Sequence, residues 1–229
     1  MKKKVIVMSL GGSLIIPGDV DYKFLLKFKQ LILKQSKHYK FIIVCGGGSI
    51  ARKYIYAIKE IGLNTDFQSF AGISATRMNA RFMSYFFKMD QEMGIPHTLK
   101  TVKEYIKQRD VVFCGALEYK PNQTSDSTAV EIARAFNTEF INLTNVQGLH
   151  DKNPFEYKNA KFIPRISWAD FDKMANKEKF KPGQHFVLDQ TASKMIKQHR
   201  ITTYILGPKM NQLDNLLDNK PFEGTVIQG

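Results

Sequence analysis

The stretch IIVCGGGSIARKY, residues 42–54, joins a short apolar run to three consecutive glycines. Arg52 follows the last of these glycines by four residues. A continuous apolar run that ends in glycine is typical of a strand buried on both faces. The residues that follow the glycines have the pattern of a helix that ends at Gly62. The stretch therefore predicts a buried strand, a glycine turn and a helix that carries a cation near its start.

The same alternation of strands and helices extends outward in both directions. The apolar run VIVMSL ends in a glycine pair, and Asp21 then caps a helical pattern. We expect strands at residues 5–10, 41–45, 95–99, 110–115, 139–144, 202–207 and 224–229. We expect helices at residues 22–32, 51–62, 73–93, 102–108, 127–136 and 189–199, the last of them capped by Asp189. Residues 150–187 are polar and irregular, which is typical of a long excursion near a functional site.

This order of elements indicates an α/β fold, with a largely parallel sheet and helices on both of its faces. The chain has 229 residues, and 43% of them are hydrophobic, which is enough for one sizeable core. No repeat, low-complexity tract or linker interrupts the sequence. We therefore expect residues 1–229 to form a single domain.

The net charge and the number of cysteines limit the kinds of protein and the cellular compartment that suit this chain. Lys and Arg total 34 against 21 Asp and Glu, so the net charge is +13. Either the surface is simply rich in lysine, or the chain binds a polyanion such as a nucleotide or a nucleic acid. The lysines are dispersed, which argues against a basic arm. The two cysteines, Cys45 and Cys114, suit a reducing interior. The apolar runs are too short for a signal peptide or a membrane span, so we expect a cytoplasmic protein.

Two glycine clusters stand at the ends of expected strands, Gly11-Gly12-Ser13 and Gly46-Gly47-Gly48. Ligands of open α/β sheets bind at the carboxyl ends of the strands. Glycine lets backbone amides approach a ligand closely, and a helix N-terminus adds partial positive charge. Two such loops suit two phosphate groups, although each could also be only a tight turn. Neither cluster has the spacing of a P-loop or of a dinucleotide-binding fingerprint.

Six short motifs occur in the order LGGS, GGGSIARKY, GISATRMNA, TSDSTA, TNVQGL and LDQTASK. Together they resemble the amino acid kinase superfamily, and within it the archaeal-type uridylate (UMP) kinases, over essentially the whole chain. The resemblance implies a three-layer sandwich with an open, mainly parallel sheet of about eight strands between helices. It implies transfer of the γ-phosphate of ATP to UMP, with Mg²⁺, for pyrimidine nucleotide biosynthesis. It also implies a hexamer whose ligands are nucleotides, with no nucleic-acid or membrane partner.

The resemblance further implies roles for residues at the matching positions. The catalytic positions are Lys194, Asp126 and Arg52, with Asp126 orienting the cations of the active site. The ATP-binding positions are Gly11, Gly12, Ser13, Gly48, Arg52, Thr144, Asn145, His150 and Asn153. The UMP-binding positions are Gly47, Ser69, Thr124 and Ser125. No residue is assigned as a metal ligand.

The chemistry of these residue types agrees with that assignment. Phosphoryl transfer depends mainly on positioning and on cations around the developing charge. Arg52 can hold a phosphate with two hydrogen bonds, and Lys194 can act as a mobile point charge. Asp126 stands at a helix start, where a carboxylate is stabilised, and could hold a lysine or magnesium. Each also has a plain alternative: Asp126 as a helix cap, and Lys194 and Arg52 as solvated surface residues.

Several positions depart from the family pattern. Ser9 stands where many members carry a lysine two residues before the glycine pair, so Lys194 and Arg52 would carry more of the charge. Ser69 replaces the aspartate that binds the acceptor ribose. Near the donor base, Gln147, His150 and Asn153 replace an aspartate, an aromatic residue and a second aspartate. These changes leave the phosphate-binding positions intact and concern base and ribose selectivity.

Other readings of the sequence follow from these departures. The chain could be a sister kinase with another phosphorylated or carboxylated acceptor, although an arginine beside the glycines favours phosphate. It could also be a nucleotide-binding homologue that has lost turnover. A basic nucleic-acid-binding domain is a further alternative, but the sequence shows no zinc pattern or RNA-binding signature.

Overall fold

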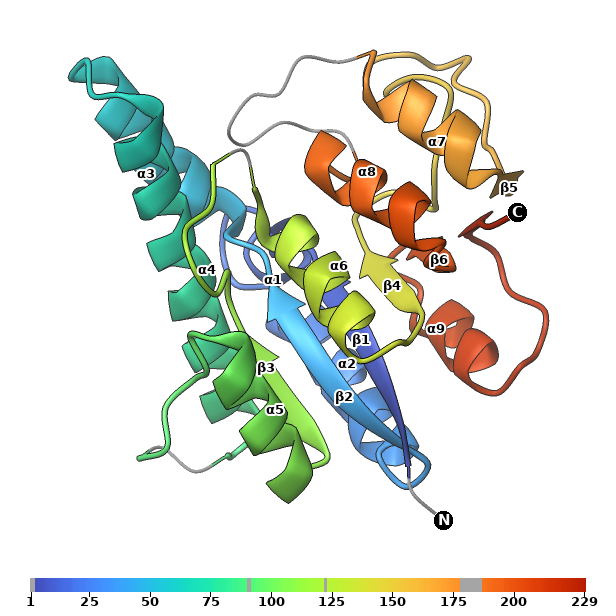
Figure 1. Ribbon diagram of the computed structural model, residues 1–229, viewed down its shortest axis with the longest axis horizontal. Helices are drawn as coiled ribbons and strands as arrows, with labels where there is room; N and C mark the ends of the chain where they lie inside the picture. The colour runs from blue at the N-terminus through green and yellow to red at the C-terminus, as the bar shows by residue number, and fades with distance from the viewer. Residues whose placement is uncertain (1–2, 90–91, 122, 178–186) are drawn as a thin grey trace.

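The computed structural model describes residues 3–89, 92–121, 123–177 and 187–229 (Figure 1). Strands and helices alternate along most of the chain, as the sequence predicted. In order they are β1 (Lys4–Leu10), α1 (Gly12–Ile15), α2 (Tyr22–Gln35), β2 (Tyr39–Cys45), α3 (Gly48–Glu60), α4 (Thr65–Phe86), α5 (Leu99–Gln108), β3 (Val111–Cys114), α6 (Ser125–Ala135), β4 (Phe140–Leu143), β5 (Arg165–Ile166), α7 (Trp168–Ala175), α8 (Gln190–His199), β6 (Thr203–Leu206), α9 (Met210–Leu217) and β7 (Thr225–Ile227).

The strands of the described residues form one sheet of seven, in the order β3-β2-β1-β4-β6-β7-β5. The first five strands in that order are mutually parallel, and β7 runs antiparallel to β6. An open, mainly parallel sheet is thus confirmed, with seven strands where about eight were expected. The strand order reverses around β1, since β2 and β4 lie on opposite sides of it. Such a reversal leaves a crevice at the carboxyl ends of the strands.

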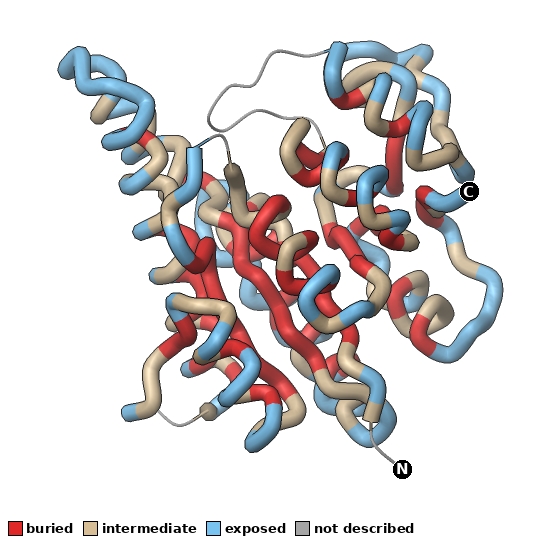
Figure 2. The backbone as a smooth tube through the Cα atoms, in the orientation of Figure 1, coloured by how far each residue is buried: buried red, intermediate tan, exposed pale blue. Residues whose placement is uncertain are grey.

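Each face of the sheet carries its own core, so the three-layer arrangement is confirmed. One core joins the sheet to α1, α2, α4 and α9, with Phe28 and Phe113 among its largest buried side chains. The other core joins the opposite face to α5, α6, α7 and α8, and it includes Phe140 and Phe171. The central strands are buried along most of their length, as the tube in Figure 2 shows. Burial on both faces explains why these strands read as continuous apolar runs.

Helix α3 packs mainly on α4, and α3 projects beyond the sheet together with the first part of α4 (Figure 1). In α3, Ser49 is the only buried residue. Several large apolar side chains of this pair and its connecting loop are exposed, namely Tyr54, Tyr56, Ile61, Leu63, Phe67 and Phe70. Exposed apolar side chains that gather on one helix pair are a common mark of protein association.

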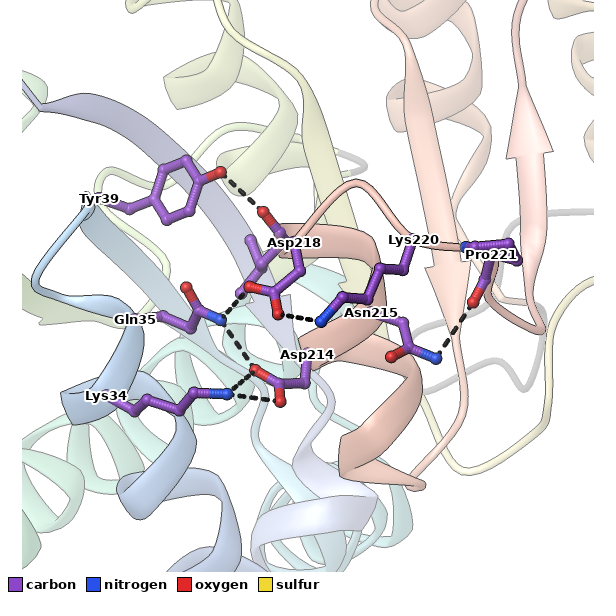
Figure 3. A network of polar contacts seen from close by, with 9 residues as sticks. Lys34, Gln35, Tyr39, Asp214, Asn215, Asp218, Lys220 and Pro221 are labelled. Carbon is purple, nitrogen blue, oxygen red and sulfur yellow. Dashed lines mark hydrogen bonds and ion pairs between the residues drawn. The ribbon is translucent and has the colours of Figure 1, made fainter.

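A polar network fastens α9 to the end of α2 (Figure 3). The buried Gln35 donates from Nε2 to Asp214 at 2.8 Å and to Asp218 at 2.9 Å. Burial opposes ionisation of Asp214, but hydrogen bonds from Lys34 and Gln35 hold the pKa of its carboxyl below the ordinary value. Since α2 ends just before β2 begins, this network lies toward the amino ends of the strands, away from the glycine loops.

Two elements predicted from the sequence differ from those in the structure. Residues 95–99 do not form a strand, because Thr98 accepts a hydrogen bond from the Thr101 amide and starts α5. The helix expected at 73–93 is α4, which begins at Thr65 because Asn64 caps it, and which ends at Phe86.

The expected excursion at 150–187 also contains regular structure in its described part, up to residue 177. The two-residue strand β5 and the helix α7 lie there, and Ser167 caps α7 by accepting from the Asp170 amide. Helix α9 was not expected from the sequence at all. Among the described residues, no helix is both long enough and apolar enough to cross a membrane.

Candidate functional site

The two glycine loops meet at the carboxyl ends of β1 and β2. These strands pair in parallel with Leu10 opposite Cys45, and the Gly46 amide donates to the Leu10 carbonyl at 2.9 Å. A Cβ atom on Gly12 would lie only 2.0 Å from the backbone nitrogen of Gly48. The loops therefore touch backbone to backbone, and only glycine at position 12 allows that approach.

The junction leaves several backbone amides available to a ligand. Within the described residues, the N–H groups of Gly12, Ser13, Gly47 and Gly48 donate to no backbone carbonyl. Gly48 begins the 13-residue helix α3, whose N-terminus adds partial positive charge. Gly48 also has a φ of +62°, a conformation that glycine adopts without strain. The arrangement suits a phosphate, which accepts hydrogen bonds from exposed amides.

Arg52 lies beside this junction on α3. Its Nη2 donates to the Pro17 carbonyl at 3.3 Å, so the guanidinium leans on the segment that follows α1. In the described part of the chain it forms no ion pair. The other donors of its guanidinium can therefore bind an anion.

Asp126 is joined to the buried Ser9 across the sheet edge. Ser9 Oγ on β1 donates to Asp126 Oδ1 at 2.5 Å, whereas Oδ2 has no hydrogen-bond partner among the described residues. The pKa of the Asp126 carboxyl is raised to about 7. Burial is the main cause of the increase, the nearby Asp189 carboxylate adds to it, and the hydrogen bond from Ser9 opposes it. A cation within a few ångströms would favour the ionised form and lower this pKa. No cation of the described residues contacts Asp126, so nothing offsets the effect of burial in this way.

Asp189 is a second carboxylate close to Asp126, and only 2% of it is exposed. It caps α8 by accepting from the Ala192 amide at 2.8 Å. It also accepts from Thr124 Oγ1 at 2.5 Å and from Ser127 Oγ at 2.6 Å. The sequence identified only its capping role, since its ties to α6 cross 62 to 65 residues of chain.

Lys194 lies on α8 beyond this cap. Ala192 and Ile196 are buried on the inner face of the helix, while Lys194 is exposed. Its ammonium contacts no acidic side chain in the described residues, unlike that of Lys197, which pairs with Asp172 at 2.8 Å. Lys194 is thus the cation of this helix that remains available to a ligand.

Helix α4 fastens the loops that follow β2 and β3. The buried Asn79 donates from Nδ2 to the Gly46 carbonyl at 2.7 Å. Thr76 Oγ1 accepts from the Ala116 amide at 3.0 Å, and Arg77 Nε donates to the Ala116 carbonyl at 3.1 Å. None of these three was predicted as a site residue, although all lie in the motif GISATRMNA. Their polar side chains at helical spacing were the available signal.

The acceptor-side positions lie along α4 and the loop after β3. A Cβ on Gly47 would lie 3.5 Å from the Ala75 Cβ, which places Gly47 against α4. Ser69 lies further toward the start of α4, with its Oγ donating to the Thr65 carbonyl at 2.8 Å. The Phe70 ring packs on Tyr119 with 4.7 Å between ring centroids, so the loop after β3 reaches this end of α4.

The donor-side positions divide into two groups. Gly11 donates to the Leu143 carbonyl at 2.9 Å, and this contact brings Thr144 and Asn145 to the glycine loops. His150 and Asn153 instead make local contacts. His150 packs on Phe162 with 5.6 Å between ring centroids. Asn153 holds a turn, in which its Nδ2 donates to Glu156 at 2.8 Å and its Oδ1 accepts from the Phe155 amide at 3.1 Å. In the described residues, no contact joins His150 or Asn153 to the glycine loops.

Known proteins resemble this chain over most of its length. The family model "Amino acid kinase family" matches residues 4–207. The uridylate kinase of Thermococcus kodakarensis is 32% identical over 225 residues, which cover 97% of this chain and 99% of that protein. The uridylate kinase of Thermoplasma volcanium is 31% identical, with 97% of both chains covered.

Solved structures give the same picture for the fold. The uridylate kinase of Archaeoglobus fulgidus matches with a TM-score of 0.81 at 28% identity, covering 98% of this chain and 99% of that one. The UMP kinase of Ureaplasma parvum matches over the full length of both chains with a TM-score of 0.78 at 22% identity, which speaks to the fold alone. On the extent of these matches, the chain belongs to the amino acid kinase family.

Proposed function

We propose that this protein is a UMP kinase that transfers the γ-phosphate of ATP to UMP. The observation that carries the proposal is the contact between the two glycine loops, with free amide groups on both and Arg52 beside them. Two phosphate-binding loops in direct contact can hold a donor and an acceptor phosphate side by side. Relatives at about 30% identity over nearly their whole length carry the name uridylate kinase, which supports this choice of acceptor.

The donor phosphates would bind to the first loop and the start of α3. Amides of Gly12, Ser13 and Gly48, together with Arg52, would hold them. Gly11 would act by fixing the loop, since its own amide is bonded to the Leu143 carbonyl, and Thr144 and Asn145 lie at the same edge. His150 and Asn153 are proposed on the adenine side. They could serve there only by presenting the surfaces that their contacts with Phe162 and Glu156 leave open.

The acceptor would bind between α4, Gly47 and the start of α6, with Ser69, Thr124 and Ser125 as its polar contacts. The single hydroxyl hydrogen of Thr124 is already donated to Asp189. Thr124 can therefore only accept a hydrogen bond from the acceptor, so it suits a ribose hydroxyl or a base N–H rather than a phosphate oxygen.

Catalysis would be electrostatic. Arg52 and Lys194 would surround the transferring phosphoryl group, whose charge is spread over its equatorial oxygens. Asp126 would orient these cations, and contact with one of them would restore its ionised form. Fixed charges in a site that excludes water stabilise a transition state more than the same charges in water.

Magnesium is the further component that the family implies. Within the described residues, no group of three or more His, Cys, Asp or Glu side chains could hold a metal ion. Mg²⁺ at nucleotide sites takes one or two carboxylates and completes its shell with phosphates and water. Asp126, whose Oδ2 has no hydrogen-bond partner in the described part of the chain, fits that donor set. When bound, the ion would neutralise charge on the phosphates.

We also infer that residues 1–229 act as one domain and that the protein assembles as a hexamer. The described strands join a single sheet, which supports the first inference. The exposed apolar side chains of α3 and α4 support self-association. Light scattering that gives the mass of a single chain would exclude the assembly.

A coupled assay with ATP and Mg²⁺ tests the proposed acceptor. UMP, CMP, AMP, GMP and isopentenyl phosphate are supplied in parallel, and we expect UMP to give the highest kcat/KM. Another acceptor that is better by about tenfold would replace UMP and establish the sister kinase instead. No turnover with any acceptor would leave a nucleotide-binding homologue.

Ser69 supplies a prediction about acceptor affinity. A neutral hydroxyl binds a ribose less strongly than a carboxylate does, by about 1 kcal/mol. Ser69→Asp should therefore lower the Kd for UMP by roughly fivefold in calorimetric titrations. The matched control is Ser74→Asp, because the exposed Ser74 makes the same bond within α4, donating to the Phe70 carbonyl at 2.9 Å. Equal effects of the two variants, or none, would mean that another group binds the ribose.

A further inference from the structure

Asp189 is held more firmly than a helix cap requires. A cap needs one hydrogen bond from the backbone of the helix that it starts. Asp21, the cap of α2, meets this requirement with a single bond from the Phe24 amide and is exposed. Asp189 makes the corresponding bond to Ala192, yet it is buried and accepts from two further hydroxyl groups.

Both additional bonds lead to another helix. Thr124 is the residue that caps α6, and Ser127 lies in the first turn of α6. The carboxylate thus joins the N-terminal ends of α6 and α8, which lie side by side on the same face of the sheet (Figure 1). In the described residues no lysine or arginine contacts Asp189. The free-energy cost of burying its carboxylate is therefore offset by hydrogen bonds from two hydroxyl groups and one backbone amide.

The two ends that Asp189 joins carry residues of the proposed active site. Thr124, Ser125 and Asp126 stand at the start of α6, and Lys194 follows Asp189 by five residues on α8. The Lys194 ammonium has no acidic partner among the described residues, so its position relative to Asp126 depends on where α8 sits against α6. A displacement of about 1 Å in such a constellation can lower a rate about a hundredfold.

We propose that Asp189 is a positioning residue, which holds the helix of Lys194 in register with the N-terminal turn of α6. This role deepens the proposed kinase function and rests on it. Asp189 touches neither nucleotide in this proposal. It acts through Lys194, so this effect appears in kcat and not in the binding of ATP.

Asp189→Asn separates this role from capping. Asparagine caps helices as well as aspartate does, so the bond from Ala192 is kept. The amide nitrogen then takes the place of Oδ2, and as a donor it cannot accept from the hydroxyl of Thr124, whereas Oδ1 can still accept from Ser127. We expect kcat to fall at least about tenfold, with the KM for ATP within about twofold of the wild type. The KM for UMP is left out of this criterion, because the variant also frees the hydroxyl of Thr124 on the proposed acceptor side. The matched control is Asp21→Asn, which makes the same change at an exposed cap without a second helix and should leave kcat unchanged.

A double-mutant cycle with Lys194→Met gives a result that a merely structural role would not produce. If Asp189 acts by placing Lys194, then Asp189→Asn should lower kcat less than about twofold once Lys194 is absent. An equal loss of kcat in both backgrounds, or a loss expressed only in the KM for ATP, would overturn the proposal. Where Asp189→Asn folds poorly in thermal melts, Ser127→Ala replaces it, since it removes one hydroxyl tie and should show the same dependence on Lys194.

The wild-type rate distinguishes this proposal from the proposed function. A wild type that phosphorylates UMP but tolerates Asp189→Asn overturns only the positioning role. If the wild type prefers another acceptor, the same cycle is measured with that acceptor. A wild type that transfers phosphate to no acceptor overturns both.

Discussion

Lys194→Met should lower the turnover number with UMP at least about a hundredfold, comparable to the loss of one preorganised donor at a transition state. Methionine keeps most of the apolar stem but removes the charge. Because Lys194 is exposed and makes no ion pair in the described residues, its loss should change the free energy of unfolding by less than about 0.5 kcal/mol. Nucleotide affinity should change little.

The size of this effect follows from the charges around the site. Ser9 occupies the position where the family pattern places a lysine, and its hydroxyl is already committed to Asp126. Asp126 and Asp189 both lack a cation among the described residues. Among the described residues, Lys194 and Arg52 are the two cations proposed to meet the transferring phosphoryl group, and Arg52 is held on the side of α3. Removal of one of these two charges should therefore lower kcat strongly.

Lys197→Met is the matched control for this experiment. Lys197 lies three residues further along the same helix, is equally exposed, and is committed to Asp172 at 2.8 Å. Its replacement should leave turnover near the wild-type value. The measurement is steady-state turnover beside a thermal melt of the same preparation. If Lys194→Met keeps more than about a tenth of the wild-type rate, Lys194 is not part of the mechanism.

The fold could be predicted because its signals are local. Strands buried on both faces read as apolar runs, and Gly or Asp at their ends marks turns and caps. The strand predicted at residues 95–99 was wrong. The segment resembles a short strand that contains Pro96, but Thr98 caps a helix that begins at the next residue. The start of α4 was missed because this part of the helix packs on α3 beyond the sheet, so its apolar residues are not confined to one core-facing stripe.

The candidate site could be predicted from the sequence only where glycine clusters indicate it. The glycine loops can be recognised in the sequence as glycine clusters at strand ends, and in the structure they are in contact. The bond from Ser9 to Asp126 spans 117 residues, and that from Thr124 to Asp189 spans 65. Such pairings are set by the strand order, and no spacing in the sequence encodes them. For the same reason, the sequence revealed the cap at Asp189 but not the two hydroxyl ties that suggest its further role.

Of the described glycines, Gly12 is the one where an added Cβ would make the shortest contact, so Gly12→Ala should be strongly damaging. The added Cβ would lie 2.0 Å from the Gly48 nitrogen, 2.6 Å from the Gly48 Cα and 2.8 Å from the Gly46 carbonyl carbon. All three are backbone atoms, so no side-chain rotation can relieve the clash. The two loops must separate, and the bond from the Ser49 amide to the Ile16 carbonyl, now 3.0 Å, must lengthen or break.

Overpacking of this kind costs about 1–3 kcal/mol, so the free energy of unfolding in urea should fall by that amount. Separation of the loops also moves the amides of Gly12 and Gly48 apart, so ATP affinity in calorimetric titrations should fall at least about tenfold. Gly18→Ala is the control, since Gly18 lies in the same segment with no atom within 4 Å of an added Cβ. It should change stability by no more than about 0.5 kcal/mol. Gly12→Ala with ATP affinity equal to that of Gly18→Ala would mean that the phosphates bind elsewhere, because the clash itself is fixed by the backbone.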